Sequence, residues 1–232
     1  MRKNPSLSTN LTSQETISGA LYCLFQLAAL SSLLTWLNRQ LSHPLDATEL
    51  NFVYYLVNFL ACLLIYHDYL GRSARQMTQH PAYFCQAVVL GFVAYYACSH
   101  AVSWCIRLLV PGFSNYNDQA IADLSRGNYF LMFIGTVILV PPAEECVFRG
   151  LIFRNLYGRS RWAAYIVSML AFAAIHILGY IGSYAPVELL MALLQYLPAG
   201  LCLAWAYTKA DTIFAPILIH ALINMNAIGA LR

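Results

Sequence analysis

The sequence predicts an all-α protein, a polytopic bundle of about seven to eight transmembrane helices. Two observations carry this prediction. Of the 232 residues, 60% are apolar and only 10% are charged, whereas soluble domains carry about 25% charged residues. Apolar runs of roughly 20 residues, the length that crosses the hydrocarbon core of a bilayer, recur along nearly the whole chain. We therefore expect a single integral membrane domain over residues 1–232, surrounded by the lipid bilayer.

The apolar runs, taken in order, define the expected helices, and short polar connectors such as "RSARQMTQHP" and "GFSNYNDQAIADLSRG" separate them. The first run is long for the apolar part of a signal peptide, and no small-residue cleavage site follows it, so we interpret it as a retained helix. The connectors leave no room for a soluble domain. The seven expected spans are residues 17–37, 50–70, 84–110, 128–157, 160–180, 186–207 and 212–230.

Basic residues set the expected orientation. With the N-terminus inside, eight basic residues lie on the cytoplasmic side and four lie outside, so the positive-inside rule favours a cytoplasmic N-terminus and an external C-terminus. The eight are Arg2, Lys3, Arg72, Arg75, Arg154, Arg159, Arg161 and Lys209, and the four are Arg39, Arg107, Arg126 and Arg232. The net charge of +3 is small and no dense basic run is present, so we expect no nucleic-acid partner.

The segment "PPAEECVFRG" places charges inside the fourth span. Since that span begins near Asn128, Glu144 lies about 24 Å along it, close to the middle of the membrane. Two carboxylates and a guanidinium are costly at that depth, and such groups usually face an interior cavity and serve a function. A purely structural ion pair that joins helices is the alternative.

The spacing within this segment suggests which groups meet. Glu145 and Arg149 are four residues apart, so they share a helical face and can pair. Glu144 is turned by about 100° from Glu145 and can point elsewhere. We expect Arg149 to hold Glu145 while Glu144 faces the reaction. Pro141 and Pro142 should break the backbone ladder, and a new helix starting at Pro142 would place both glutamates in its first turn.

Polar partners occur in two later spans. "FAAIH" places His176 one turn after Phe172, and "HALIN" places His220 and Asn224 on one face. His176, His220 and Glu144 lie about 24, 14 and 20 Å from the cytoplasmic ends of their spans, so they can converge at a similar depth. A single histidine in a membrane is often a packing residue, but this combination favours a catalytic site.

The cysteines suggest no site of their own. None of the seven forms a C-x-x-C pair, so a zinc knuckle or a redox site has no support. Cys146 lies between the glutamates and the arginine, where a nucleophilic cysteine must be considered. We interpret it as an apolar packing residue.

The segments "EECVFRG", "FAAIH" and "HALIN" resemble the motifs EExxxR, FxxxH and HxxxN of the CAAX-protease and bacteriocin-processing family, also called the Abi family. Its eukaryotic members include the Ras-converting CAAX endopeptidase. The motifs span residues 144–224, and their order on three hydrophobic spans makes the combination specific. The resemblance implies an intramembrane endopeptidase in which Glu145 and Arg149 support the catalytic geometry.

The resemblance also implies the remaining roles. Glu144 matches the glutamate that activates the attacking water, with assistance from His176, as in a glutamate peptidase. His220 and Asn224 match the pair that stabilises the oxyanion. This agrees with the chemistry of peptide hydrolysis, which needs a base for the water and hydrogen-bond donors for the tetrahedral intermediate.

We expect no cofactor, but a metal-dependent variant of the same protease stays open. Glu144, His176 and His220 could ligate zinc and leave one position for water. HExxH is absent, which gives no support to a zincin or site-2 protease, and GxSG and GxGD are absent as well.

Two non-proteolytic functions also stay open: a bacteriocin-immunity or membrane-scaffold protein, and a small transporter that uses the buried charges as a proton relay. The intact motif set favours the protease. Its expected partner is a membrane-associated peptide or protein substrate, and the compact chain is typical of a prokaryotic member in the cytoplasmic membrane.

Overall fold

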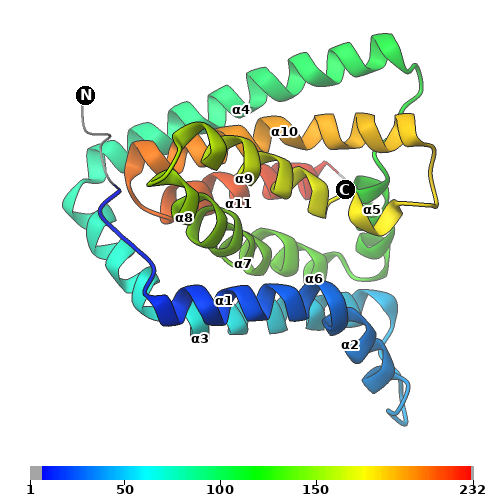
Figure 1. Cartoon of the computed structure of the whole chain (residues 1–232). Coiled ribbons are helices and arrows are strands. Elements are labelled where there is room, and N and C mark those ends of the chain that lie inside the picture. Colours follow the sequence, from blue (N-terminus) through cyan, green and yellow to red (C-terminus); the bar gives the residue numbers. More distant parts are fainter. Residues whose placement is uncertain (1–6, 231–232) are drawn as a thin grey trace.

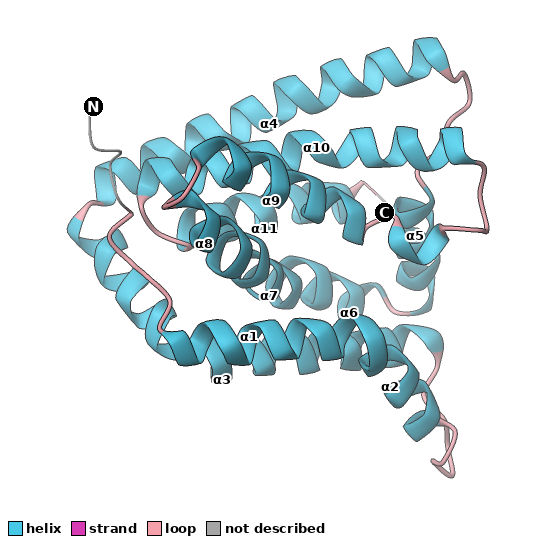
Figure 2. Ribbon diagram, in the orientation of Figure 1, coloured by secondary structure: helices cyan, strands magenta, loops and turns pink. Residues whose placement is uncertain are grey.

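The computed structural model describes residues 7–230, and every regular element within them is helical (Figure 2). Among the described residues, five helices are long and apolar enough to cross a membrane, and two shorter helices are also apolar. The five are Ser13–Asn38, Ala47–Gln79, Pro81–Leu109, Tyr129–Tyr157 and Pro186–Ala210, and the two are Arg161–Ile175 and Phe214–Gly229. These seven correspond in order to the seven expected spans, so the predicted fold class is confirmed.

Two of the spans are composite helices in which α-helical and π-helical segments alternate. The first consists of α1 (Ser13–Phe25), η1 (Gln26–Leu30) and α2 (Ser31–Asn38). The fourth consists of α6 (Tyr129–Ile134), η2 (Gly135–Leu139), α7 (Val140–Glu145), η3 (Cys146–Phe153) and α8 (Arg154–Tyr157). The others are α3 (Ala47–Gln79), α4 (Pro81–Leu109), α5 (Tyr116–Gly127), α9 (Arg161–Ile175), the short turn η4 (Leu178–Tyr180), α10 (Pro186–Ala210) and α11 (Phe214–Gly229).

The fourth span occupies the middle of the bundle (Figure 1). It packs against α3 on one side and against α9 and α11 on the other, while α1 lies along α3 and α4 lies along α10. Large apolar side chains such as Trp162 and Leu64 are about four-fifths exposed, as expected for surfaces that face lipid rather than water. The protein is therefore an integral membrane protein.

Two basic side chains fasten the N-terminal segment to one end of the bundle. Arg154 Nε donates to the Thr9 carbonyl over 2.8 Å, and Arg72 donates to the Asn10 carbonyl over 3.0 Å. Both arginines therefore lie at the same end of the bundle as residues 9 and 10. Arg2, Lys3 and Arg232 lie outside the described residues.

Gly200 allows α9 and α10 to approach closely. A Cβ atom at this position would lie 2.9 Å from Met169 Cα and 3.0 Å from the Met169 carbonyl oxygen. Neither backbone atom can move without shifting α9. We expect Gly200→Ala to lower the free energy of unfolding by about 1–3 kcal/mol, measured by equilibrium unfolding in detergent micelles.

The control for this prediction is Gly71→Ala in α3, where a new Cβ would meet nothing within 4 Å. Alanine is favoured over glycine inside a helix by about 1 kcal/mol, so this variant should be as stable as the wild type or slightly more stable. Equal losses in the two variants would show that the approach of α9 and α10 is not the cause.

Candidate active site

The fourth span continues through both prolines, which contradicts the expected break. The π-helical segment η2 precedes them, and the Val140 N–H donates to the Gly135 carbonyl five residues earlier. Pro141 and Pro142 lack an N–H group, and the wider turn absorbs the missing hydrogen bonds without ending the helix. α7 therefore begins at Val140, and both glutamates lie at its C-terminal end. The expected first-turn position, with its favourable helix dipole, is wrong.

Glu145 and Arg149 form a fully buried ion pair, as their spacing predicts. Arg149 Nη1 lies 3.0 Å from Glu145 Oε1, and both side chains are 0% exposed. Arg149 Nη2 also donates to the Gly200 carbonyl over 3.1 Å. The guanidinium carbon lies 4.7 Å from the centre of the Phe172 ring, within the range of a cation–π contact. Contacts with α7, α9 and α10 thus hold Arg149 in place, and Arg149 in turn holds the Glu145 side chain.

His220 of α11 connects the two glutamates. Its Nδ1 lies 2.9 Å from Glu145 Oε1, and its Nε2 lies 4.0 Å from Glu144 Oε2. Because a carboxylate only accepts, Nδ1 carries the hydrogen of this bond. Nε2 then accepts hydrogen bonds in the neutral ring and donates them in the imidazolium ring.

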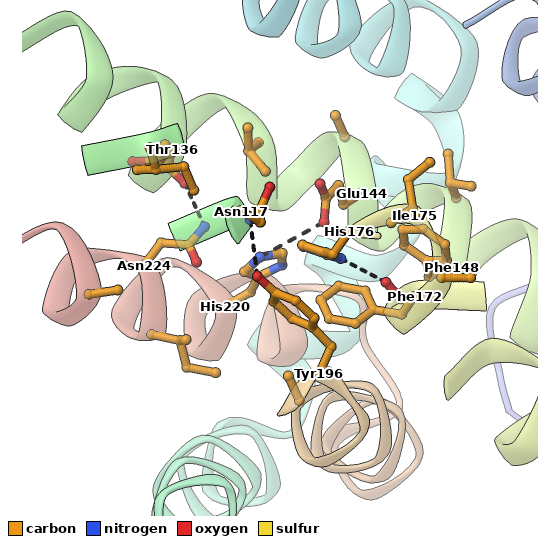
Figure 3. Close-up of a pocket in the computed structure, with 18 of the residues that line it drawn as sticks. Asn117, Thr136, Glu144, Phe148, Phe172, Ile175, His176, Tyr196, His220 and Asn224 are labelled. Atoms are coloured by element: carbon orange, nitrogen blue, oxygen red, sulfur yellow. Dashed lines mark hydrogen bonds and ion pairs between the residues drawn. The ribbon is translucent and has the colours of Figure 1, made fainter. Parts of the chain in front are cut away.

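Glu144 faces a cavity of about 920 Å³ that His176, His220 and Asn224 also line (Figure 3). Its side chain is 26% exposed, and its Oε2 atom is buried without a hydrogen-bond partner among the described residues. Glu145 and Arg149 do not line the cavity. Glu144 therefore faces the cavity and Glu145 does not, as expected from the rotation of about 100° between neighbouring residues of a helix.

His176 stands at the end of α9 rather than inside it. The helix ends at Ile175, so the expected fifth span, residues 160–180, is too long at its C-terminal end. After Ile175 the chain forms turns and the short segment η4 instead of continuing the helix, and Gly182 beyond η4 adopts a φ of 87°, which ordinary helices do not allow. The His176 Nδ1 lies 2.7 Å from the Phe172 carbonyl, so Nδ1 is the donor and Nε2 is left as an acceptor.

Asn224 presents one amide hydrogen to the protein and leaves the other available. Its Nδ2 donates to the Thr136 carbonyl over 2.8 Å, which fixes the amide plane at the cavity wall (Figure 3). An amide nitrogen carries two hydrogens. The second can serve an acceptor inside the cavity.

Glu144, His176 and His220 are chemically suitable zinc ligands, but the described residues do not gather them around one point. Within residues 7–230, no three His, Cys, Asp or Glu side chains are placed so that they could hold a metal ion. Cys146 is fully buried in an apolar cluster with Cys62 and does not line the cavity, in keeping with its interpretation as a packing residue.

A polar group that the motifs do not reveal lies at one end of the cavity. The connector after α4 folds into α5, capped by Asn115, whose side chain accepts from the Asn117 N–H. Asn117, Asp118 and, from α10, Tyr196 all line the cavity. Burial raises the pKa of Asp118, while the hydrogen bond from the Tyr196 hydroxyl acts in the opposite direction. An asparagine N-cap followed by an amphipathic run was the available signal for α5.

Comparison with known proteins agrees with this site. Residues 126–226 match a family model described as "Type II CAAX prenyl endopeptidase Rce1-like". Over 114 residues, 49% of this chain, the sequence is 31% identical to the "Putative membrane peptidase YdiL" of Bacillus subtilis (strain 168). The match covers 42% of that relative, so the chain spans about two fifths of its length. No solved structure matches the chain. The resemblance predicted from the three motifs is thereby confirmed: the region that carries the three motifs is similar to the Rce1-like CAAX prenyl endopeptidases.

Proposed function

We propose that the protein is an intramembrane endopeptidase that hydrolyses a peptide bond in a membrane-associated peptide or protein tail. One observation carries the proposal: a carboxylate, two imidazoles and an amide from three helices line a single cavity within the membrane-spanning bundle. These groups are Glu144, His176, His220 and Asn224. The names of the matching family and of the matching relative both describe peptidases.

The cavity contains a group for each step of hydrolysis. Glu144 takes a proton from a water molecule, whose oxygen attacks the carbonyl carbon of the scissile bond. The His176 Nε2 atom accepts a hydrogen bond from the same water and orients it. The resulting oxyanion takes hydrogen bonds from the free amide hydrogen of Asn224 and from the Nε2–H of the His220 imidazolium. When the carbon–nitrogen bond breaks, the proton held by Glu144 passes to the leaving amine.

Glu145 and Arg149 act behind this site. Glu145 holds the His220 ring by its Nδ1 and is itself held by Arg149. The pair therefore helps to hold His220 in place, and neither residue lines the cavity or contacts a substrate. No cofactor enters this mechanism. We further propose that the N-terminus lies in the cytoplasm of a prokaryotic cell and that the scissile bond is reached from within the membrane.

The test is cleavage of a library of membrane-associated peptides by the purified protein, reconstituted in lipid and followed by mass spectrometry. An identically purified His176→Ala variant identifies cuts made by contaminating proteases. We expect wild-type cleavage that the variant lacks and that a metal chelator does not abolish. Loss of cleavage with the chelator would indicate the metal-dependent variant. Absence of cleavage by folded wild type would overturn the proposal and favour an immunity or scaffold role, and proton-coupled flux into vesicles would indicate a transporter.

A further inference from the structure

Tyr196 lies flat against the imidazole of His176. The two ring centres are 4.2 Å apart and the ring planes differ by 23° (Figure 3). Offset stacking of aromatic rings at such distances is favourable. Tyr196 belongs to α10 and lies outside all three sequence motifs.

His176 needs support because its own backbone supplies little. It is the first residue after α9, where the chain leaves the helix. The Phe172 ring centre also lies 4.8 Å from that of His176, with the ring planes tilted, and the Phe172 carbonyl accepts from Nδ1. The imidazole is therefore in contact with two aromatic rings and fixed at one nitrogen. Nε2 is the nitrogen left for the cavity.

The tyrosine ring is itself anchored by its hydroxyl group. This oxygen accepts a hydrogen bond from Asn117 Nδ2 over 3.1 Å and donates to Asp118 Oδ1 over 3.2 Å. Asn115 Nδ2 also donates to the neighbouring Gln195 over 2.8 Å. The start of α5 and the middle of α10 thus fix Tyr196 at the outer end of the cavity.

We propose that Tyr196 is a positioning residue for His176, and that α5 contributes to catalysis by holding Tyr196 in place. This inference rests on the proposed peptidase function. Tyr196 touches neither the reacting atoms nor the water in this scheme. It acts by keeping the His176 ring in one plane and in the tautomer with hydrogen on Nδ1.

The kinetic test compares two substitutions that differ in the ring. Tyr196→Leu removes the stacked plane, and we expect kcat to fall about 30-fold with KM nearly unchanged, since small displacements of catalytic groups cost up to about 100-fold. Tyr196→Phe keeps the plane and loses only the hydroxyl anchor, so kcat should stay within about fivefold of the wild type. If Tyr196→Leu does not fold, Tyr196→Met fills the same space without a ring and carries the same expectation.

Tyr184→Leu is the matched control. Tyr184 also stacks on a ring of α5, with its centre 3.3 Å from that of Tyr116, but it does not line the cavity. Its loss should leave kcat unchanged. A Tyr196→Leu variant whose kcat equals that of this control, or which changes KM alone, overturns the proposal.

A second measurement does not depend on cleavage. Nitrogen-15 spectra of histidine-labelled protein, with His176 assigned from a His176→Asn variant, report which ring nitrogen carries hydrogen. We expect one tautomer in the wild type and in Tyr196→Phe, and averaged nitrogen signals in Tyr196→Leu. Identical spectra in all three would overturn the positioning role. If these spectra are obtained but the protein cleaves no peptide, the proposed peptidase function is wrong. The positioning of His176 by Tyr196 would still hold.

Discussion

Glu144→Gln is expected to lower kcat by about 10³- to 10⁴-fold, the largest effect of any single substitution in the cavity. Glutamine has nearly the same shape as glutamate but cannot take a proton from water. The fold should tolerate the change, because the carboxylate is partly exposed and one of its oxygens has no hydrogen-bond partner among the described residues. The measurement is kcat on the best library peptide, together with the midpoint of thermal unfolding.

Glu188→Gln serves as the control for Glu144. Glu188 accepts from the Ala185 N–H at the start of α10 and does not line the cavity, so its substitution should change kcat by less than about twofold. Should Glu144→Gln retain a tenth or more of wild-type activity, another group would have to be the base.

Arg149→Met is expected to lower the free energy of unfolding by about 3–5 kcal/mol, because it leaves a carboxylate uncompensated in the core. Both partners of this ion pair are completely buried. The methionine fills the volume of the arginine stem, which separates the loss of charge from the creation of a cavity. Equilibrium unfolding in mixed micelles measures the effect.

Two comparisons decide whether charge is the cause. Arg126 pairs with Asp123 on the exposed face of α5, and Arg126→Met should cost less than about 1 kcal/mol. Adding Glu145→Gln to Arg149→Met neutralises the stranded carboxylate and should recover part of the lost stability. If the double variant is no more stable than Arg149→Met alone, packing rather than charge dominates at this position.

The sequence was sufficient to predict the membrane-spanning helices and to predict that Glu144 and Glu145 point in different directions. Apolar length determines where a helix can cross a bilayer, and the 100° step between neighbouring residues separates Glu144 from Glu145. Both are local properties. The three motifs then identified the groups that meet at the cavity. The distances between these groups depend on the tertiary fold and cannot be read from any single segment.

Two features were not predicted from the sequence: the continuous helix through Pro141 and Pro142, and the position of Tyr196 beside His176. Pro141 and Pro142 predict a break, but a π-helical turn upstream of them accommodates the missing donors, and its position is not encoded by any simple periodicity. Tyr196 stands in an apolar span where an aromatic residue has no distinguishing pattern. Its significance comes from contact with His176 and with Asn117 of α5, segments far from it along the chain.

The Glu145–Arg149 ion pair lies within a single span. This affects the order in which the site is assembled during biosynthesis. When the fourth span leaves the ribosome, its carboxylate and guanidinium can neutralise each other before any later helix exists, which lowers the cost of entering the bilayer. His220, the next partner of Glu145, follows 75 residues later and arrives with the last described helix. Biosynthesis therefore inserts the mutually neutralised Glu145 and Arg149 first, and the imidazole that would serve the oxyanion joins them only when α11 is in place.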